Sequence, residues 1–138
     1  MWQADIPLVM PFKLIDMYQK EIAAIEQLIT NYFNGIFKGD VNLLGSCFQE
    51  DVIIYGDSEG DEYKKSVASY LDGVANRKSP SELDETFAMK IIGIDVMGKI
   101  AMAKLHVPML GYNYYDYLSL WKIDDTWKIV NKVFTHVA

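Results

Sequence analysis

The C-terminal part of the chain places polar side chains among aromatic ones. If residues 124–126 form the loop of a hairpin, Ser119 faces Asn131, and Trp121 and Trp127 lie on the same face. Such a polar pair can orient a small molecule in a mostly apolar pocket. The two side chains could instead satisfy each other's hydrogen bonds in the core. With two tyrosines from earlier in the chain, the predicted ligand-binding residues are Tyr32, Tyr55, Tyr117, Ser119, Trp121, Trp127 and Asn131.

Three side chains, Tyr32 again among them, could serve chemistry at such a pocket. Asp57 follows a glycine near the predicted mouth and could act as a general base, or belong to a solvated loop. Tyr32 lies on an apolar helical stripe, so its hydroxyl could face the pocket or reach a polar group in the core. His106 shares a strand face with Lys104, opposite an all-apolar row, which predicts an outward position. A different register of residues 99–109 would make His106 a candidate base.

The remaining polar clusters do not match metal or phosphate sites. The acidic positions 57, 59, 61 and 62 lack the regular ligand spacing of a calcium loop. Neither His106 nor His136 has a second histidine or cysteine at metal-ligand spacing. The glycine-bounded stretch 56–60 has no lysine and does not resemble a P-loop. We therefore expect no metal and no cofactor.

Composition excludes further classes of partner. The chain has 138 residues, a net charge of −6 and no run of Lys or Arg longer than two, so nucleic acid is not expected to bind.

Cys47 is the only cysteine, which favours a reducing, cytoplasmic compartment. Its place beside Phe48 indicates packing, with a reactive thiol as the alternative. No apolar run is long enough to cross a membrane. Residues 1–16 lack a signal-peptide pattern and are expected to form an extended or disordered arm.

Helical periodicity dominates the first third of the domain, which we place at residues 17–138. Asp16 and Gln19 resemble a capping box ahead of a long amphipathic helix. This helix should end at Gly39, and Asp40 can then cap a short second helix. The apolar stripe consists of Ile22, Ile25, Ile29, Tyr32, Phe33 and Ile36.

The rest of the chain shifts from helical to strand periodicity. A strand over 51–55, an acidic loop over 56–60 and a third helix ending near Asn76 are followed by a linker over 77–84. Four candidate strands follow, at residues 85–95, 99–109, 113–123 and 127–136. This order predicts an α+β fold in which a curved antiparallel sheet wraps the N-terminal helix as a cone with an internal pocket.

The same hairpin register predicts what lies outside the cone. The outer face would carry Asp116 and Lys132, near enough on the diagonal to pair, together with apolar side chains. An apolar outer face on a small domain indicates a partner, so we expect an isologous homodimer through it. The apolar residues concerned are Leu118, Leu120, Val130 and Phe134.

Two segments are similar to a known superfamily. IEQLITNYFNGIFKGDVNLLGSCFQEDVIIYGD and DYLSLWKIDDTWKIVNKVF resemble the nuclear-transport-factor-2-like superfamily, a cystatin-like cone. Within it the chain looks closest to the putative lumazine-binding and SnoaL-like group of small bacterial proteins. The resemblance implies the cone fold. It does not imply one function, because the superfamily includes isomerases, dehydratases, cyclases, transport factors and binding modules.

The ketosteroid isomerases of this superfamily permit a comparison residue by residue. Aligning their helix break on Gly39-Asp40 places Tyr32 where those enzymes have an oxyanion-donating tyrosine. It also places Gly56 where they have the proton-abstracting carboxylate, with Asp57 one residue later. Ser119 falls where they have a protonated aspartic acid. The base is therefore missing in register, and the candidate catalytic residues are Asp57, Tyr32 and His106.

Three hypotheses follow. The first is a binding domain that holds a flat, largely apolar molecule in an aromatic cone. The second is an isomerase, dehydratase or cyclase with Asp57 or His106 as base and Tyr32 as oxyanion donor. The third is a dimerisation module whose cone is filled by its own side chains.

Overall fold

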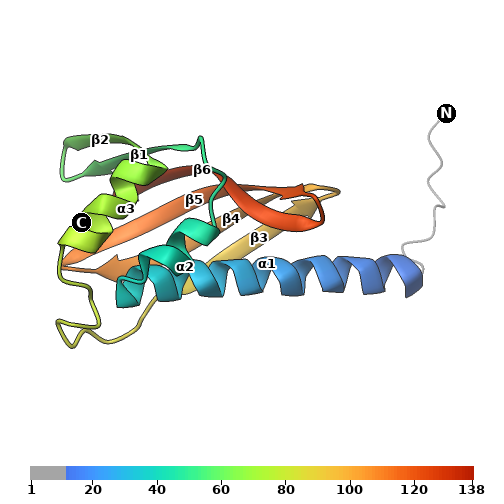
Figure 1. Cartoon of the computed structure of the whole chain (residues 1–138). Coiled ribbons are helices and arrows are strands. Elements are labelled where there is room, and N and C mark those ends of the chain that lie inside the picture. The colour runs from blue at the N-terminus through green and yellow to red at the C-terminus, as the bar shows by residue number, and fades with distance from the viewer. Residues whose placement is uncertain (1–11) are drawn as a thin grey trace.

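The computed structural model describes residues 12–138 and consists of three helices and one six-stranded sheet (Figure 1). Of the predicted arm, residues 1–11 lie outside the described residues, and residues 12–16 belong to the first helix. The elements are α1 (Phe12–Lys38), α2 (Val41–Ser46), β1 (Ile53–Ser58), β2 (Asp61–Ser66), α3 (Val67–Asn76), β3 (Lys90–Met97), β4 (Ile100–Met109), β5 (Tyr112–Ile123) and β6 (Thr126–His136).

The strands form a curved sheet in the order β2-β1-β6-β5-β4-β3. All neighbours are antiparallel except β1 and β6, which run parallel. In Figure 1, α1 runs along one face of the sheet, and α2 and α3 lie on the same side. The predicted α+β cone is confirmed, with β2 and β3 as the two edges of the sheet.

The first helix buries the predicted apolar stripe. Ile25, Ile29, Tyr32 and Ile36 are at most 1% exposed. The helix ends as expected, with Gly39 at a φ of +68° and Asp40 accepting a hydrogen bond from the Leu43 amide at 3.1 Å. Its start differs from the prediction, since α1 begins at Phe12 and Asp16 lies inside it. No glycine or proline occurs between positions 12 and 34 to interrupt the helix before Asp16.

The predicted acidic loop is a β-hairpin. Strand β1 continues to Ser58, and Asp57 pairs with Glu62 of β2 across a tight turn. Glu59 and Gly60 at the turn have φ values of +53° and +91°, as two-residue hairpin turns require. The prediction assigned residues 61–66 to no strand; they are mostly charged, and charges are common on edge strands, where they oppose association with other sheets.

The linker after α3 is held in place by its own hydrogen bonds. Ser79 is buried, its hydroxyl accepts from the Glu82 amide at 3.1 Å, and the Glu82 carboxylate accepts from the Ser79 amide at 3.2 Å. The Ser81 amide donates to the carbonyl of Phe37 at the end of α1, at 3.0 Å. Strand β3 starts only at Lys90, five residues later than predicted at position 85.

The last hairpin differs from the prediction in both its turn and its register. The turn contains only Asp124 and Asp125, at φ values of +47° and +66°, so Ile123 pairs with Thr126. The register shifts between Ser119 and Leu120, which leaves Val130 as the extra residue of a β-bulge on β6. Ser119 still pairs with Asn131 as predicted. The buried Ile129 pairs with Leu120 and not, as predicted, with Trp121. Neighbouring strand residues point to opposite sides, so the side chains predicted to face outward along β5 and along the end of β6 are the ones that pack on the helices.

Candidate functional site

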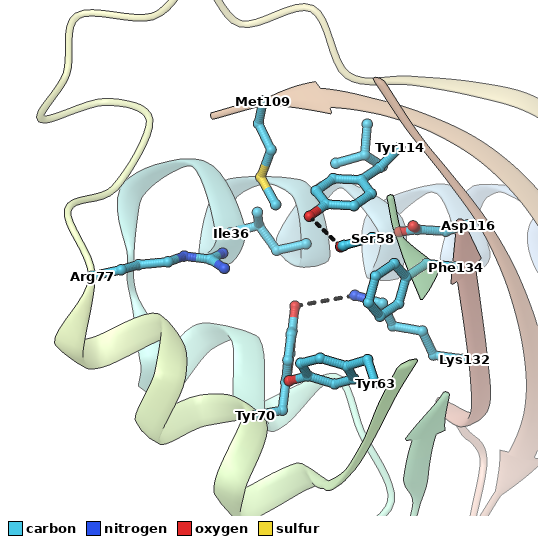
Figure 2. Close-up of a pocket in the computed structure, with 11 residues that line it drawn as sticks. Ile36, Ser58, Tyr63, Tyr70, Arg77, Met109, Tyr114, Asp116, Lys132 and Phe134 are labelled. Carbon is cyan, nitrogen blue, oxygen red and sulfur yellow. Dashed lines mark hydrogen bonds between the residues drawn. The ribbon is translucent and has the colours of Figure 1, made fainter. Parts of the chain in front are cut away.

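A cavity of about 150 Å³ lies at the end of the sheet beside α3, where β4 and β6 end and β5 begins (Figure 2). Its buried floor comes from Ile36, Tyr70, Val107, Asp116 and Lys132. Partly exposed side chains complete the lining, so the cavity reaches the surface. These are Ser58, Tyr63, Arg77, Met109, Tyr114 and Phe134.

A buried carboxyl group forms one wall. Asp116 on β5 is 1% exposed, and its Oδ2 accepts a hydrogen bond of 2.5 Å from the hydroxyl of Tyr32 on α1. Burial raises the pKa of Asp116, while the Lys132 ammonium and the Tyr32 hydroxyl oppose that rise. Burial, and secondarily the neighbouring Asp116, raises the pKa of Tyr32 well above its usual value. Tyr32 therefore remains a neutral donor, and its hydroxyl is committed to Asp116.

A buried ammonium group lies on the neighbouring strand. Lys132 is 5% exposed, and its Nζ donates to the hydroxyl of Tyr70 at 3.2 Å. The same Nζ lies over three aromatic rings, 4.5 Å from the centroid of Tyr70, 5.1 Å from Tyr32 and 5.4 Å from Phe134. This aromatic cage and the nearby carboxyl group compensate for the water that the ammonium lost on burial.

The third charged group of the cavity is Arg77, the residue that follows α3. Figure 2 shows its guanidinium pointing into the space bounded by Ile36, Met109 and Tyr70. Its Nε and Nη2 atoms are buried, and within residues 12–138 neither has a hydrogen-bond partner. The anchored turn around Ser79 fixes the chain directly after this side chain.

The side chains at the mouth of the cavity add hydroxyl groups, some of which already form hydrogen bonds with each other. The Tyr114 and Ser58 hydroxyls bond each other at 2.9 Å across the mouth. Burial raises the pKa of Tyr63 to about 12, so its hydroxyl stays protonated at neutral pH. The cavity thus combines flat aromatic walls with hydroxyl donors, one carboxyl and two cations.

Most of the predicted ligand-binding residues lie elsewhere. The inward orientation predicted for five of them is wrong. The short turn places the even-numbered residues of β5 inside, the bulge at Val130 turns Asn131 outward, and Tyr55 points outward from β1. Tyr32 is buried beside the cavity floor, whereas Trp127 is buried farther along and donates from Nε1 to Glu21 at 2.9 Å. The side chains on the outer face of the sheet are Tyr117, Ser119, Trp121 and Asn131, together with Tyr55 of β1, which is 43% exposed.

The two predicted bases are not in the cavity lining. Asp57 accepts from the Gly60 amide at 2.9 Å and from the Thr135 hydroxyl at 3.4 Å, so it stabilises the β1–β2 turn. His106 stacks on Tyr115 at 4.5 Å between ring centroids and bonds Asn113 at 2.6 Å. His106 thus takes the outward position that its strand pattern predicted.

The sequence reasoning missed the charged centre of the cavity. Asp116 and Lys132 were expected to pair on the outer face, and the reversed hairpin faces bring both inside. The available sequence signal for an inward polar group was a Tyr, Asp or Lys in a row of alternate strand residues that is otherwise apolar. The alternate row contains more aromatic residues, which favours an outer position for the row Tyr114, Asp116, Leu118 and Leu120. Arg77 gives no sequence signal, since it is the first residue of the predicted linker.

Cys47 packs away from the cavity. Its side chain is 1% exposed, its Sγ lies 3.5 Å from the Leu43 carbonyl, and burial raises the thiol pKa to about 11. We expect the folded protein to react with a thiol reagent at pH 8 about two orders of magnitude more slowly than the guanidinium-unfolded chain. Stopped-flow labelling measures both rates. Rapid labelling of the folded protein would favour the reactive-thiol alternative.

The raised pKa of Asp116 predicts an unusual pH dependence of stability. The folded state holds this proton more tightly than the unfolded state, so the contribution of Asp116 is fully present below the unfolded pKa of about 3.9 and is lost as pH rises through the folded pKa. The stability difference, wild type minus Asp116→Asn, should therefore fall with pH in this window, by at most about 1.4 kcal/mol per pH unit. Urea unfolding of both proteins between pH 4 and 8 measures it. A difference that rises with pH would contradict the assignment.

The comparisons with known proteins agree with the cone fold. The model of a family described as "Putative lumazine-binding" matches residues 20–135. The chain belongs to this family. A search of curated proteins found no match.

Solved structures show that this family member has a nuclear-transport-factor-2-like fold. An NTF2-like protein of unknown function from Methylobacillus flagellatus superposes with a TM-score of 0.78 at 23% identity, covering 86% of this chain and 94% of that one. A protein of the same description from Shewanella baltica gives 0.76 at 22% identity, with 88% and 97% covered. A third from Silicibacter pomeroyi gives 0.75 at 22% identity, with 87% and 98% covered.

Within residues 12–138, none of the helices combines the length and the apolar character that a membrane span needs. The same residues contain no group of three or more His, Cys, Asp or Glu side chains arranged to hold a metal ion.

Proposed function

We propose that this protein is a small-molecule-binding domain and that its site is the cavity lined by Arg77, Asp116 and Lys132. The observation that carries the proposal is the buried, unpartnered Nε–Nη2 edge of Arg77 at a cavity. Buried polar groups normally have hydrogen-bond partners, and each one left without a partner costs about 1–3 kcal/mol. A ligand with acceptor atoms would supply the missing partners.

The dimensions of the cavity indicate the size of the ligand. An engineered protein cavity of about 150 Å³ holds one benzene molecule. The present cavity has that volume, with Tyr63, Tyr70 and Tyr114 as flat walls. The expected ligand is therefore still flat, as the sequence suggested, but it is limited to about one ring with a polar substituent. The fused three-ring system of a flavin would not fit without a rearrangement of the walls.

Ligand-observed NMR with a library of single-ring compounds tests this proposal. We expect hits for the wild type that disappear in Met109→Phe, which fills the cavity from β4. The control is Leu83→Phe, which adds the same ring at a side chain that is 48% exposed in the loop between α3 and β3. Signals that persist unchanged in Met109→Phe would place binding elsewhere and contradict the proposal.

Enzyme activity has less support in this geometry. The Tyr32 hydroxyl, the expected oxyanion donor, already donates to Asp116, and the candidate bases Asp57 and His106 bond residues away from the cavity lining. The isomerase comparison placed Ser119 at the position of the protonated aspartic acid. In this structure the carboxyl group that bonds Tyr32 belongs to Asp116, three positions earlier on β5. We therefore favour binding over catalysis.

We also propose that the outer face of the sheet forms a homodimer. Its residues differ from those predicted, because Leu118 and Leu120 are buried against the helices. In their place, Ile100 pairs with Trp121 on the neighbouring strand, and these side chains are 58% and 51% exposed. Exposed apolar side chains gathered on one face indicate a partner surface, and a second copy supplies the same side chains in return. Other large exposed side chains of this face include Tyr55, Met97, Met102, Tyr117 and Val133.

Sedimentation equilibrium tests the dimer. We expect a mass of about twice the chain's 15.8 kDa, and a shift to monomer in Trp121→Glu. Leu83→Glu is the control, because Leu83 is 48% exposed but lies in the loop between α3 and β3. A wild-type monomer at the concentrations used for crystallisation would overturn the dimer proposal.

A further inference from the structure

Two cations and one carboxyl group surround the cavity, and their balance suggests what kind of molecule it selects. Arg77 and Lys132 carry positive charge, and Asp116 contributes at most one negative charge. The lining therefore has a net charge of at least +1 at neutral pH, in a protein whose total is −6. The positive charge is local to the cavity, which favours an anion only at short range.

The two cations differ in what they leave unsatisfied. Lys132 already has the hydroxyl of Tyr70 and three aromatic rings around its ammonium group. Arg77 has two buried donors, Nε and Nη2, without an acceptor among residues 12–138. These two nitrogens form one edge of the planar guanidinium group, and their N–H bonds run nearly parallel. A carboxylate matches that edge with its two oxygens, because both interactions can form at once.

The surroundings limit the rest of the molecule. Ile36, Val107 and Met109 offer only apolar contacts, and the tyrosine rings offer flat faces. The Asp116 carboxyl group would repel a second anionic group placed deeper in the cavity whenever it is ionised. These features fit one anionic group at Arg77 and a short uncharged body behind it.

We infer that the cavity binds a monocarboxylate with a small aromatic or apolar body, held through its carboxylate by Nε and Nη2 of Arg77. This inference rests on the proposed binding function and names the ligand class of that site.

Isothermal titration calorimetry with matched probes tests the inference. Benzoate and benzamide have nearly the same shape but differ in charge, and propionate and propionamide are a smaller pair of the same kind. We expect each carboxylate to bind at least tenfold more tightly than its amide. In Arg77→Gln this preference should disappear, whereas in Lys78→Gln, which removes the neighbouring exposed cation, it should persist.

Arg77→Lys separates charge from geometry and guards against misfolding of the glutamine variant. It keeps one positive charge but lacks the paired donors, so we expect an intermediate loss of the carboxylate preference. Circular dichroism should show all three variants folded. Full preference in Arg77→Lys and Arg77→Gln would overturn the inference.

The outcomes distinguish this inference from the function on which it depends. Equal binding of benzoate and benzamide, abolished by Met109→Phe, would overturn the carboxylate assignment and leave the cavity as a binding site. No binding of any of the four probes to the wild type would count against both proposals.

Discussion

Replacing Lys132 with methionine is expected to lower the free energy of unfolding by about 3–5 kcal/mol at pH 7, because it leaves the buried Asp116 carboxylate without its nearby cation. The loss should be much smaller at pH 4. Removing the ammonium raises the Asp116 pKa further, so the carboxyl group takes up a proton and no longer needs a counter-charge. Urea unfolding at the two pH values measures both losses.

Lys65→Met is the matched control for this variant. Lys65 also lies over a tyrosine ring, 5.0 Å from the centroid of Tyr63, but it is exposed on the edge strand β2. Its replacement should change stability by no more than about 0.5 kcal/mol at either pH. A Lys132→Met loss of equal size at pH 4 and pH 7 would show that the two groups are not electrostatically coupled.

Gly56→Ala is expected to lower the free energy of unfolding by about 1–3 kcal/mol through overpacking. A methyl group at this position would overlap the ring of Phe134, which pairs with Gly56 across β1 and β6. The ring has little room to move, since Tyr63 and Tyr114 pack edge-on against it at 5.2 and 5.4 Å between centroids. Thermal and urea unfolding measure the loss.

A double-mutant cycle isolates the cause of that loss. In a Phe134→Leu background the smaller side chain vacates part of the space, so Gly56→Ala should cost less there than in the wild type. Gly93→Ala is the control, because a methyl group on Gly93 meets no atom within 4 Å. Equal costs of Gly56→Ala in both backgrounds would mean that the Phe134 ring is not what excludes a side chain.

The Gly56–Phe134 contact also explains a departure from the related isomerases. The sequence comparison placed Gly56 where those enzymes have their base. In this fold the phenylalanine ring occupies the space that a carboxylate side chain would need. The same ring forms part of the Lys132 cage. The position of Phe134 therefore both builds the cavity wall and excludes a side chain at position 56.

The helical half of the fold was predictable because its signals are local. The stripe from Ile25 to Ile36 repeats at helical spacing, and Gly39-Asp40 combines a left-handed residue with a helix cap. The strand segments after residue 99 were also recognisable from their alternation. These patterns are sufficient to predict the α+β cone.

The site was not predictable to the same extent because it depends on hairpin register. A loop of two residues in place of three reverses which side chains of β5 point inward, and the bulge at Val130 does the same for the end of β6. These two changes move Ser119 and Trp121 out of the cone and Asp116 and Lys132 into it. The contacts of the inward side chains join distant segments, as in the bond between Tyr32 and Asp116, and a sequence pattern does not contain them.

Arg77 could not be recognised for a different reason. Its importance comes from hydrogen bonds that it does not make within the described chain, and an unpartnered donor is visible only when all neighbouring acceptors are known. The sequence placed it in a linker between a helix and a strand. The structure shows that this linker is anchored by Ser79 and Glu82, which lets it present a side chain to the cavity.

A crystal structure of the protein soaked with benzoate tests the central claim most directly. We predict density for one molecule in the cavity, with its carboxylate oxygens against Nε and Nη2 of Arg77 and its ring between Tyr70 and Met109. A cavity that contains only water at saturating benzoate, or benzoate bound only on the outer face of the sheet, would contradict the account.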